Sequence, residues 1–336
     1  MASISLAIKM GSSSTLIYKQ GEGIVLSEPS MVAVQTSGKN RIVRAVGTKA
    51  KRILGRTDKN TQVVSPIFRG VIIDSQLAEA MLRAFLSKII EKTFKKPSIR
   101  AIVCVPIGIS AVEVKNFEKV CLNCGIGEVI FVPSVLCGAV GMSLPVLSSS
   151  SSFVVNMGGG TTDIAVVSSG NIISGISLGF GGTDLDTSIE NLIATDFKLL
   201  IGADVPEKIK IELASLFKND SSNEEIFGVD TVTNQSRTDV ISASDLLPVV
   251  EEHYHKLAIA IRDLLNTCSP EIVADVAEKG VYVCGGASGI SGLEQFLSAK
   301  LGLNVLVDES ANFIEVIGAG KLLSDNRTLK ELTYYL

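Results

Sequence analysis

A run of glycines followed by threonines forms one turn in this chain that could hold an anion. Gly158, Gly159 and Gly160 precede Thr161 within residues 153–167, between two apolar, β-branched runs that predict two strands joined by a tight turn. Glycine lets backbone N–H groups point into one concavity, and threonine adds a hydroxyl donor. No Gly-Lys-Ser/Thr follows, so this is not a Walker loop. The turn is a candidate phosphate cradle.

The same pattern occurs near the N-terminus. When residues 7–18 are laid over residues 154–165, Lys9 falls on Asn156, and a second apolar run follows each turn. An internal repeat of this kind predicts two similar domains. We expect the two hairpins to face each other across a cleft and to hold one polyphosphate. The residues that they would offer are Lys9, Gly11, Ser12, Ser13 and Ser14 from the first, and Asn156, Gly158, Gly159, Gly160 and Thr161 from the second.

A third glycine-rich turn lies between a predicted strand at 280–284 and a predicted helix at 290–301. Backbone N–H groups at the start of a helix attract anions, so Gly285, Gly286 and Ala287 are candidates for a further nucleotide contact. The predicted helix at 207–215 carries several charged residues. We expect Lys208, Lys210 or Glu212 of this helix to lie near a base and ribose.

Composition limits the class of protein. A chain of 336 residues with 46% hydrophobic residues supports two domains of ordinary size with ample core. Residues 129–162 carry no charge, but Pro133, Pro145 and the glycines of the turn interrupt the run before it reaches the roughly 20 apolar residues of a membrane span. We expect no signal peptide. The net charge of −4 gives no reason to expect nucleic acid as a partner.

The cysteines and histidines give no sign of a metal site. Cys121 and Cys124 form a single C-x-x-C pair without the second half that a zinc site needs, and the six cysteines fit a reduced, cytosolic protein. His253 and His255 lie on a predicted helix at 244–268 without an acidic or cysteine partner at ligand spacing. We expect both histidines at the surface or in an interface.

Strand and helix patterns alternate along the chain. Continuous apolar runs at 99–105 and 128–132 predict buried strands, and the 3.6-residue period at 74–92 predicts an amphipathic helix. Helices of small residues are predicted at 134–142 and after residue 315, and a polar β-segment at 225–240. This alternation is typical of an α/β fold with a largely buried sheet.

Three glycine-bearing turns in this order, with two helices of small residues, resemble the actin-like ATPase superfamily. Within it the chain is similar over nearly its whole length to the MreB family of bacterial cell-shape actins. The stretches that carry the resemblance are the hairpin at 154–167, GIVLSEPS at 23–30, AKRILGRT at 50–57, PIFRGVI at 66–72, VPIGI at 105–109 and Ile201–Gly202 with EKIKIE at 207–212.

The resemblance implies an actin-like (ribonuclease H-like) α/β fold with a nucleotide cleft between two similar domains. Domain I would comprise residues 1–138 with 313–336, and domain II residues 139–312. ATP or ADP would bind in the cleft. Subunits would assemble into paired protofilaments, alone or with paralogous filament proteins. Such filaments are cytoplasmic and peripheral at the inner face of the cell membrane, where they guide the elongation machinery that determines cell shape.

Departures from the family pattern concern the metal ion and the attacking water. Family members carry aspartates where this chain has Lys9 and Asn156, and those aspartates hold Mg²⁺, mostly through water. The family glutamate that orients the attacking water is Val132 here, whereas Thr161, which helps to place that water, is kept. The resemblance therefore implies nucleotide binding with weakened hydrolysis and puts Mg²⁺ in doubt. We expect Lys9 to meet the phosphates in place of the metal, with Asn156 leaving it free of an ion pair.

Two other readings stay open. One is a fully active actin-fold ATPase or sugar kinase, for which Asp163 and Asp184 are the candidate acids in the cleft loops. The other is a regulatory paralogue that does not polymerise. Membrane contact in the family uses an N-terminal amphipathic helix or a hydrophobic loop; no helix fits before the strand predicted at 3–8, and the loop would be a short stretch with Phe94 between basic residues.

Overall fold

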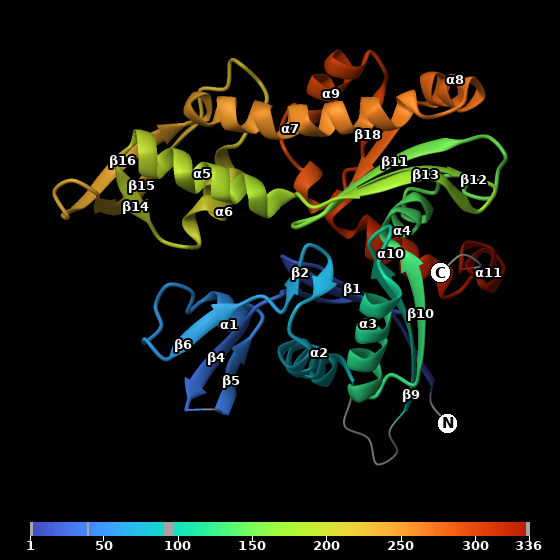
Figure 1. The fold of residues 1–336 in the computed structure, drawn as a ribbon, viewed down its shortest axis with the longest axis horizontal. Coiled ribbons are helices and arrows are strands. Elements are labelled where there is room, and N and C mark those ends of the chain that lie inside the picture. The colour runs from blue at the N-terminus through green and yellow to red at the C-terminus, as the bar shows by residue number, and fades with distance from the viewer. Residues whose placement is uncertain (1–2, 39, 91–96, 334–336) are drawn as a thin grey trace.

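The computed structural model describes residues 3–38, 40–90 and 97–333 of the chain, and two five-stranded sheets form its centre (Figure 1). The first sheet has the order β10-β9-β1-β2-β3 and the second the order β13-β12-β11-β17-β18. The strands of the first are β1 (Ser3–Met10), β2 (Ser14–Lys19), β3 (Gly23–Pro29), β9 (Ser98–Val105) and β10 (Glu128–Pro133). Those of the second are β11 (Ser152–Met157), β12 (Thr162–Ser168), β13 (Asn171–Leu178), β17 (Val281–Cys284) and β18 (Val305–Val307).

The two sheets repeat one arrangement, as the sequence repeat predicts. In each, a hairpin of antiparallel strands is extended by an antiparallel third strand on one side and by parallel strands on the other. Lys9 near the end of β1 lies opposite Cys104 of the parallel neighbour β9, and Asn156 near the end of β11 lies opposite Cys284 of β17. Lys9 and Asn156 therefore occupy equivalent positions in the two halves of the molecule.

Two helices of small residues, α4 (Ser134–Gly141) and α10 (Ala311–Leu322), pack between the sheets (Figure 1). Their backbones touch: a Cβ placed on Gly318 would lie 1.8 Å from the carbonyl oxygen of Cys137, and one on Gly141 would lie 2.2 Å from that of Ile314. Only glycine permits so close an approach. The surrounding core takes buried side chains from both sheets, so these helices join the two halves.

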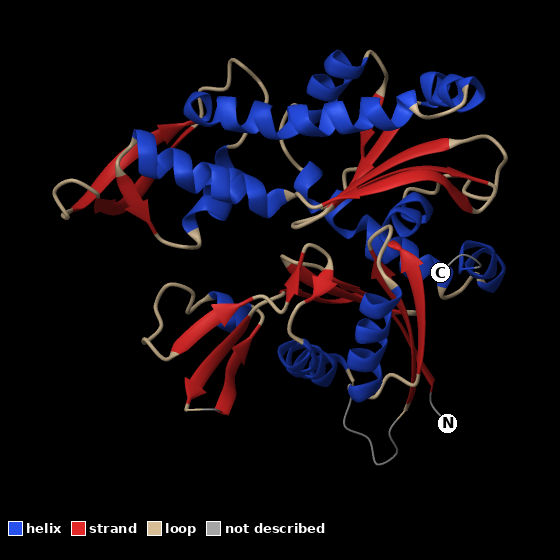
Figure 2. Cartoon of the chain, in the orientation of Figure 1, coloured by secondary structure: helices blue, strands red, loops and turns tan. Residues whose placement is uncertain are grey.

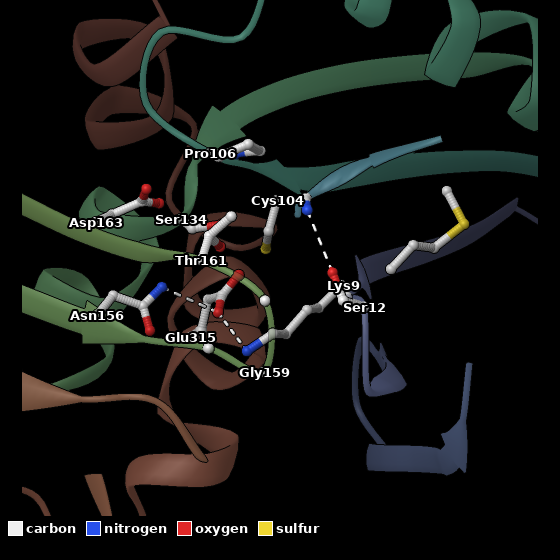
Figure 3. A pocket seen from close by; sticks show the side chains of 15 residues that line it. Lys9, Ser12, Cys104, Pro106, Ser134, Asn156, Gly159, Thr161, Asp163 and Glu315 are labelled. Atoms are coloured by element: carbon white, nitrogen blue, oxygen red, sulfur yellow. Dashed lines mark hydrogen bonds and ion pairs between the residues drawn. The ribbon is translucent and has the colours of Figure 1, made fainter. Parts of the chain in front are cut away.

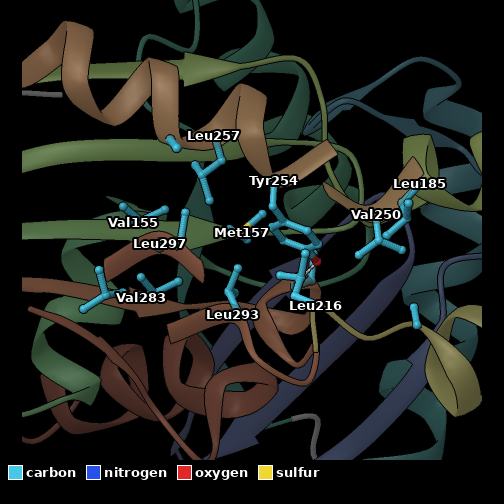
Figure 4. Packing of buried hydrophobic residues seen from close by; sticks show 14 of the residues in the cluster. Val155, Met157, Leu185, Leu216, Val250, Tyr254, Leu257, Val283, Leu293 and Leu297 are labelled. Carbon is cyan, nitrogen blue, oxygen red and sulfur yellow. Dashed lines mark hydrogen bonds between the residues drawn. The ribbon is translucent and has the colours of Figure 1, made fainter. Parts of the chain in front are cut away.

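The outer faces of the sheets are covered by longer amphipathic helices (Figure 2). Helices α2 (Ser75–Ile89) and α3 (Ala111–Asn123) cover the first sheet, and α5 (Gly182–Asp196), α7 (Ala243–Asn266) and α9 (Leu293–Leu301) cover the second, with α8 (Pro270–Lys279) beyond α7. The phenol of Tyr254 lies fully buried in the second core and donates a hydrogen bond to the carbonyl of Ala287 at 2.5 Å (Figure 4). This bond ties α7 to the third glycine turn.

Each half also carries a small three-stranded sheet at its far end. The first contains β4 (Val32–Ser37), β5 (Asn40–Val46) and β6 (Thr61–Val64) with the short helix α1 (Thr48–Lys51). The second contains β14 (Leu199–Ile201), β15 (Asn223–Asp230) and β16 (Ser236–Ser242) with α6 (Val205–Leu213), and strands β15 and β16 confirm the polar β-segment predicted at 225–240. The remaining elements are β7 (Ile67–Phe68), β8 (Val71–Ile72), the 3₁₀ turn η1 (Gly286–Ser288) and α11 (Asn326–Thr333).

Within the described residues, no helix combines the length and the apolar character needed to cross a bilayer. The Phe94 segment falls outside the described residues. All six cysteines are free.

The expected surface position of His253 is wrong, whereas His255 is exposed. His253 shares a face of α7 with Leu246, Val250 and Leu257, and it is only 6% exposed. Its ring meets Phe180 and Tyr254 edge to face, with centroids 5.3 and 5.1 Å away. Burial lowers the pKa of His253 to about 4, so the imidazole is neutral and belongs to the core.

The contact between α4 and α10 makes Gly318 a sensitive position. We expect Gly318→Ala to lower the free energy of unfolding by about 3 kcal/mol, because the added methyl group forces two packed backbones apart. Gly127→Ala is the matched control, since a Cβ there would lie 3.7 Å from its nearest neighbour, the carbonyl oxygen of Ile99. Urea unfolding followed by circular dichroism measures both variants. Equal stability of the two would contradict the proposed role of this helix contact.

Candidate functional site

The turns of the two glycine hairpins meet at the floor of a cleft. A Cβ on Gly159 would lie 2.6 Å from the Cβ of Ser13, and one on Gly160 would lie 2.5 Å from the Oγ of Ser12. Glycine at these two positions therefore lets the second turn approach the first. The two turns also close alike, since the N–H of the first glycine in each donates to the carbonyl three residues later.

Above the turns lies a cleft of about 400 Å³, which is within the usual range for small-molecule sites. Both halves of the molecule contribute to its walls. The lining residues are Lys9, Gly11, Ser12, Ser13, Ser14, Gly158, Gly159, Gly182, Thr183, Glu207, Lys210, Ile211, Tyr254, Gly286, Ala287, Gly289, Ile290 and Asn312. The structure thus brings the first hairpin, the second hairpin and the turn after β17 to one cleft.

The third turn reaches the cleft through Gly286 and Ala287 but not through Gly285. Gly285 has a φ of +93°, and a Cβ there would lie 2.3 Å from the carbonyl oxygen of Met157. Its role is to turn the chain against β11 so that the next two residues line the cleft.

Of the three residues expected near a base and ribose, Lys210 lines the cleft, whereas Lys208 and Glu212 do not. These two side chains lie 3.6 Å apart and line a separate hollow beside the turn at 202–204. Successive helical residues are rotated by about 100°, so the face of α6 that meets the cleft carries Glu207 and Lys210 instead. Lys210 bonds to Asp186 at 2.7 Å and to the carbonyl of Gly182 at 2.9 Å.

Two ion pairs join the halves across the cleft. Lys51 of α1 meets Glu207 of α6 at 2.5 Å, and Arg69, between β7 and β8, lies 3.8 Å from Asp184 of α5. Asp184 also accepts a hydrogen bond from the N–H of Gly181 at 2.8 Å and so caps α5. Because the charged groups are partly exposed, each pair contributes little to stability.

Beneath the cleft, a hollow of about 40 Å³ contains a buried charge cluster (Figure 3). The ammonium of Lys9 lies 2.6 Å from Glu315 Oε2, and the amide of Asn156 donates to the same oxygen at 3.2 Å. Glu315 is 1% exposed, and the side chain of Lys9 is 13% exposed. Three elements, β1, β11 and α10, therefore meet through one carboxylate oxygen.

This cluster corrects the expectation that Asn156 leaves Lys9 without an ion pair. Burial by itself disfavours the charged form of Lys9, but the charge and the hydrogen bond of Glu315 outweigh it and hold the pKa of Lys9 above its ordinary value. The sequence contains one signal that could have revealed the partner. Glu315 is the single acidic residue of the small-residue helix α10, and an isolated acidic residue on such a helix indicates a polar partner.

Thr161, Ser134 and Asp163 line the same hollow, which forms the floor of the cleft, whereas Val132 does not line it. Val132 is fully buried in the core between the sheets. Asp163 is 2% exposed, and its Oδ1 has no hydrogen-bond partner within the described part of the chain. Burial raises the pKa of Asp163 to about 7. The floor thus offers a hydroxyl pair and a carboxyl group that titrates near neutrality.

The raised pKa of Asp163 gives a testable dependence of stability on pH. Between its ordinary value of 3.8 and about 7, the folded state holds a proton that the unfolded state has lost. Stability should therefore fall as pH rises through this window, by up to about 4 kcal/mol. Asp163→Asn should flatten this part of the curve, whereas Asp263→Asn, at an exposed position, should not. Urea unfolding from pH 4 to 8 tests it; parallel curves for Asp163→Asn and the unmodified protein would refute the assignment.

Comparison with known proteins places this geometry in a family. The model for MreB/Mbl protein matches residues 3–331. The chain is 34% identical to the cell shape-determining protein MreB of Escherichia coli (strain K12) over 326 residues, which cover 96% of this chain and 94% of that protein. It is 36% identical to the cell shape-determining protein Mbl of Bacillus subtilis (strain 168) over 324 residues, or 95% and 96% of the two chains.

Solved structures agree. MreB5 of Spiroplasma citri bound to AMPPNP superimposes with a TM-score of 0.90 at 25% identity over 97% of each chain. The MamK double helical filament has a TM-score of 0.79 at 19% identity over 96% of this chain and 99% of that one. The chain therefore has the actin-like fold and belongs to the MreB/Mbl family.

Proposed function

We propose that this protein is a bacterial actin-like filament protein that binds adenine nucleotide in its cleft and hydrolyses ATP slowly. The observation that carries the proposal is the convergence of three glycine-bearing turns on one cleft of about 400 Å³. MreB5 of Spiroplasma citri, which shares the fold, has been crystallised with AMPPNP and with ADP.

The phosphates would lie against the backbone N–H groups of the two hairpins, where glycine leaves the amides uncovered. Glu207 and Lys210 would hold the ribose and base from the side of α6, and Gly286 with Ala287 would close the site from the third turn. When bound, ATP supplies a phosphoanhydride bond. The chain itself supplies the cradle, the charge of Lys9 and the exclusion of bulk water from the floor.

The floor does not fit a divalent cation. Mg²⁺ takes oxygen ligands, usually carboxylates and water. Here an ammonium and the N–H of an amide already contact Oε2 of Glu315, and the other carboxyl group among the described residues that line the hollow, Asp163, has its pKa raised to about 7 by burial. Within the described ranges, no group of three or more His, Cys, Asp or Glu side chains could hold a metal ion.

Weak hydrolysis follows from the residue at the end of β10. A side chain that positions the attacking water and takes its proton typically contributes about 10²–10⁴-fold, and the buried Val132 has no acceptor. One observation favours the alternative of a fully active enzyme. The unpaired Oδ1 of Asp163 lies in the same hollow as Thr161, and its carboxyl titrates near pH 7. In that alternative, Asp163 would act as the base.

We further propose that subunits assemble into filaments at the inner face of the cell membrane, on the cytoplasmic side. There they would act in cell-shape determination with the elongation machinery and, where present, with paralogous filament proteins. Exposed apolar side chains support subunit contacts: Val112 on α3 is 77% exposed, and Phe227 and Val232 at the β15–β16 hairpin are 65% and 80% exposed. Named relatives are cell shape-determining proteins, and MamK forms a double helical filament.

A substitution in the second glycine turn tests the phosphate cradle. Gly159→Val should abolish ADP binding, because the new side chain would meet Ser13 and force the two hairpins apart. Calorimetric titration with ADP measures the loss, and circular dichroism checks that the variant is folded. Gly127→Ala, where a methyl group has room, serves as the control. A folded Gly159→Val protein with unchanged affinity would remove the cleft from this account.

A further prediction concerns filament assembly and the rate of ATP hydrolysis. Purified protein should enter the pellet on ultracentrifugation when ATP is added, while releasing phosphate more slowly than a relative with acidic residues at positions 9, 132 and 156. A protein that stays in the supernatant at high concentration, with and without ATP and lipid, would indicate a regulatory paralogue instead. Phosphate release as fast as in the relative, and lost in Asp163→Asn, would indicate the active enzyme.

A further inference from the structure

The packing of α10 against the sheets does not by itself require the ion pair between Lys9 and Glu315. The residues around Glu315 on α10 are apolar or small, and the helix packs through glycine contacts and buried aliphatic groups. Burying two charges removes both from water, and an apolar pair of similar size often stabilises a protein as well or better. The packing of α10 therefore does not explain why these two charges are buried.

The ammonium of Lys9 is placed where an anion in the cleft would meet it. Lys9 lines both the small hollow at the floor and the larger cleft above it. An ammonium has three N–H donors, and within the described residues the side chain of Lys9 pairs with Glu315 alone. Donor capacity therefore remains at the point where the two glycine turns converge.

Glu315 is held in its present position by a second contact. The amide of Asn156 donates to the same carboxylate oxygen that Lys9 contacts, and Asn156 itself is only 5% exposed. This hydrogen bond does not involve the ammonium. In the empty cleft the charges of Lys9 and Glu315 thus cancel each other.

We propose that Glu315 is an internal competitor of the nucleotide's phosphates for Lys9, and so sets how tightly the cleft holds them. This inference rests on the proposed nucleotide site and names the residue that regulates it. A phosphate that approaches Lys9 must share the ammonium with Glu315 and lie near the negative charge of that carboxylate. With Glu315 present, Lys9 already has a counter-ion when the cleft holds neither ligand nor metal. The affinity of the cleft for the phosphates is lower as a result.

Removal of the carboxylate charge has two opposed effects on phosphate binding. It removes a like charge from a buried floor and leaves the Lys9 ammonium without its partner, and both changes favour a bound phosphate. It also leaves the side chain of Lys9 free to move. A bound phosphate must then fix this side chain, which costs at most the rotamer entropy of one lysine. The charge effect is the larger because the floor is shielded from water, so the net result is tighter binding.

The test is calorimetric titration of ADP and of adenosine, both in excess chelator, into the unmodified protein, Glu315→Gln and Lys9→Met. Glutamine keeps the shape of the side chain and can still accept from Asn156. We expect Glu315→Gln to bind ADP at least about tenfold more tightly, a difference of about 1.4 kcal/mol, with the affinity for adenosine unchanged. Lys9→Met should weaken ADP binding. Glu252→Gln, at an exposed site on α7, removes the same charge elsewhere and should change neither affinity.

The outcomes separate this inference from the proposed function. If the unmodified protein binds ADP and Glu315→Gln binds it no more tightly, the competition is refuted while the nucleotide site stands. If only Glu315→Gln binds ADP, the competition holds and nucleotide binding by the unmodified protein fails. If neither protein binds, or if adenosine affinity rises equally, the competition is refuted.

Thermal melts keep the test decisive where Glu315→Gln is poorly stable. The variant leaves a buried ammonium without a counter-ion, so its melting temperature should fall below that of the unmodified protein. ADP should restore it by more than it raises that of the unmodified protein, since the phosphate supplies the missing charge, and adenosine should not. Equal stabilisation by ADP and adenosine would refute the competition.

Discussion

The backbone contact between α4 and α10 fixes the position of everything at the cleft floor. Because Gly318 and Gly141 let these helices touch, the two sheets come close enough for their hairpin turns to meet. The same packing places Glu315, three residues before Gly318, beneath the ends of β1 and β11. A wider separation of the helices would take the carboxylate out of reach of Lys9. The packing of α4 against α10 therefore also determines whether the ion pair at the floor can form.

The floor brings together three ionisable side chains, Lys9, Glu315 and Asp163, in surroundings that water barely reaches. Lys9 and Glu315 neutralise each other, and the raised pKa of Asp163 makes its charge depend on pH near neutrality. In the proposal made above, the floor meets an anion through the remaining donors of Lys9. In the account proposed here, the chain carries a fixed charge of its own where a metal ion would otherwise accompany the phosphates.

Much of this could be predicted from the sequence, because the signals are local. The hairpins follow from β-branched runs around glycine turns, and the internal repeat aligned Lys9 with Asn156 correctly. Long-range partners could not be found in this way. Glu315 lies some 300 positions from Lys9, and nothing in the spacing of either residue indicates that α10 crosses beneath β1. Of the residues on α6 that line the cleft, Lys210 was expected and Glu207 was missed, because a helix seen alone does not show which face meets the cleft.

A crystal structure of the protein grown with ADP and Mn²⁺ tests the central claim most directly, because manganese is identified by its anomalous scattering. The account predicts no manganese peak between Lys9 and Asn156, and the ammonium of Lys9 within hydrogen-bond distance of a phosphate oxygen. A manganese ion bound to the phosphates at that position, with Lys9 still paired to Glu315 alone, would contradict it.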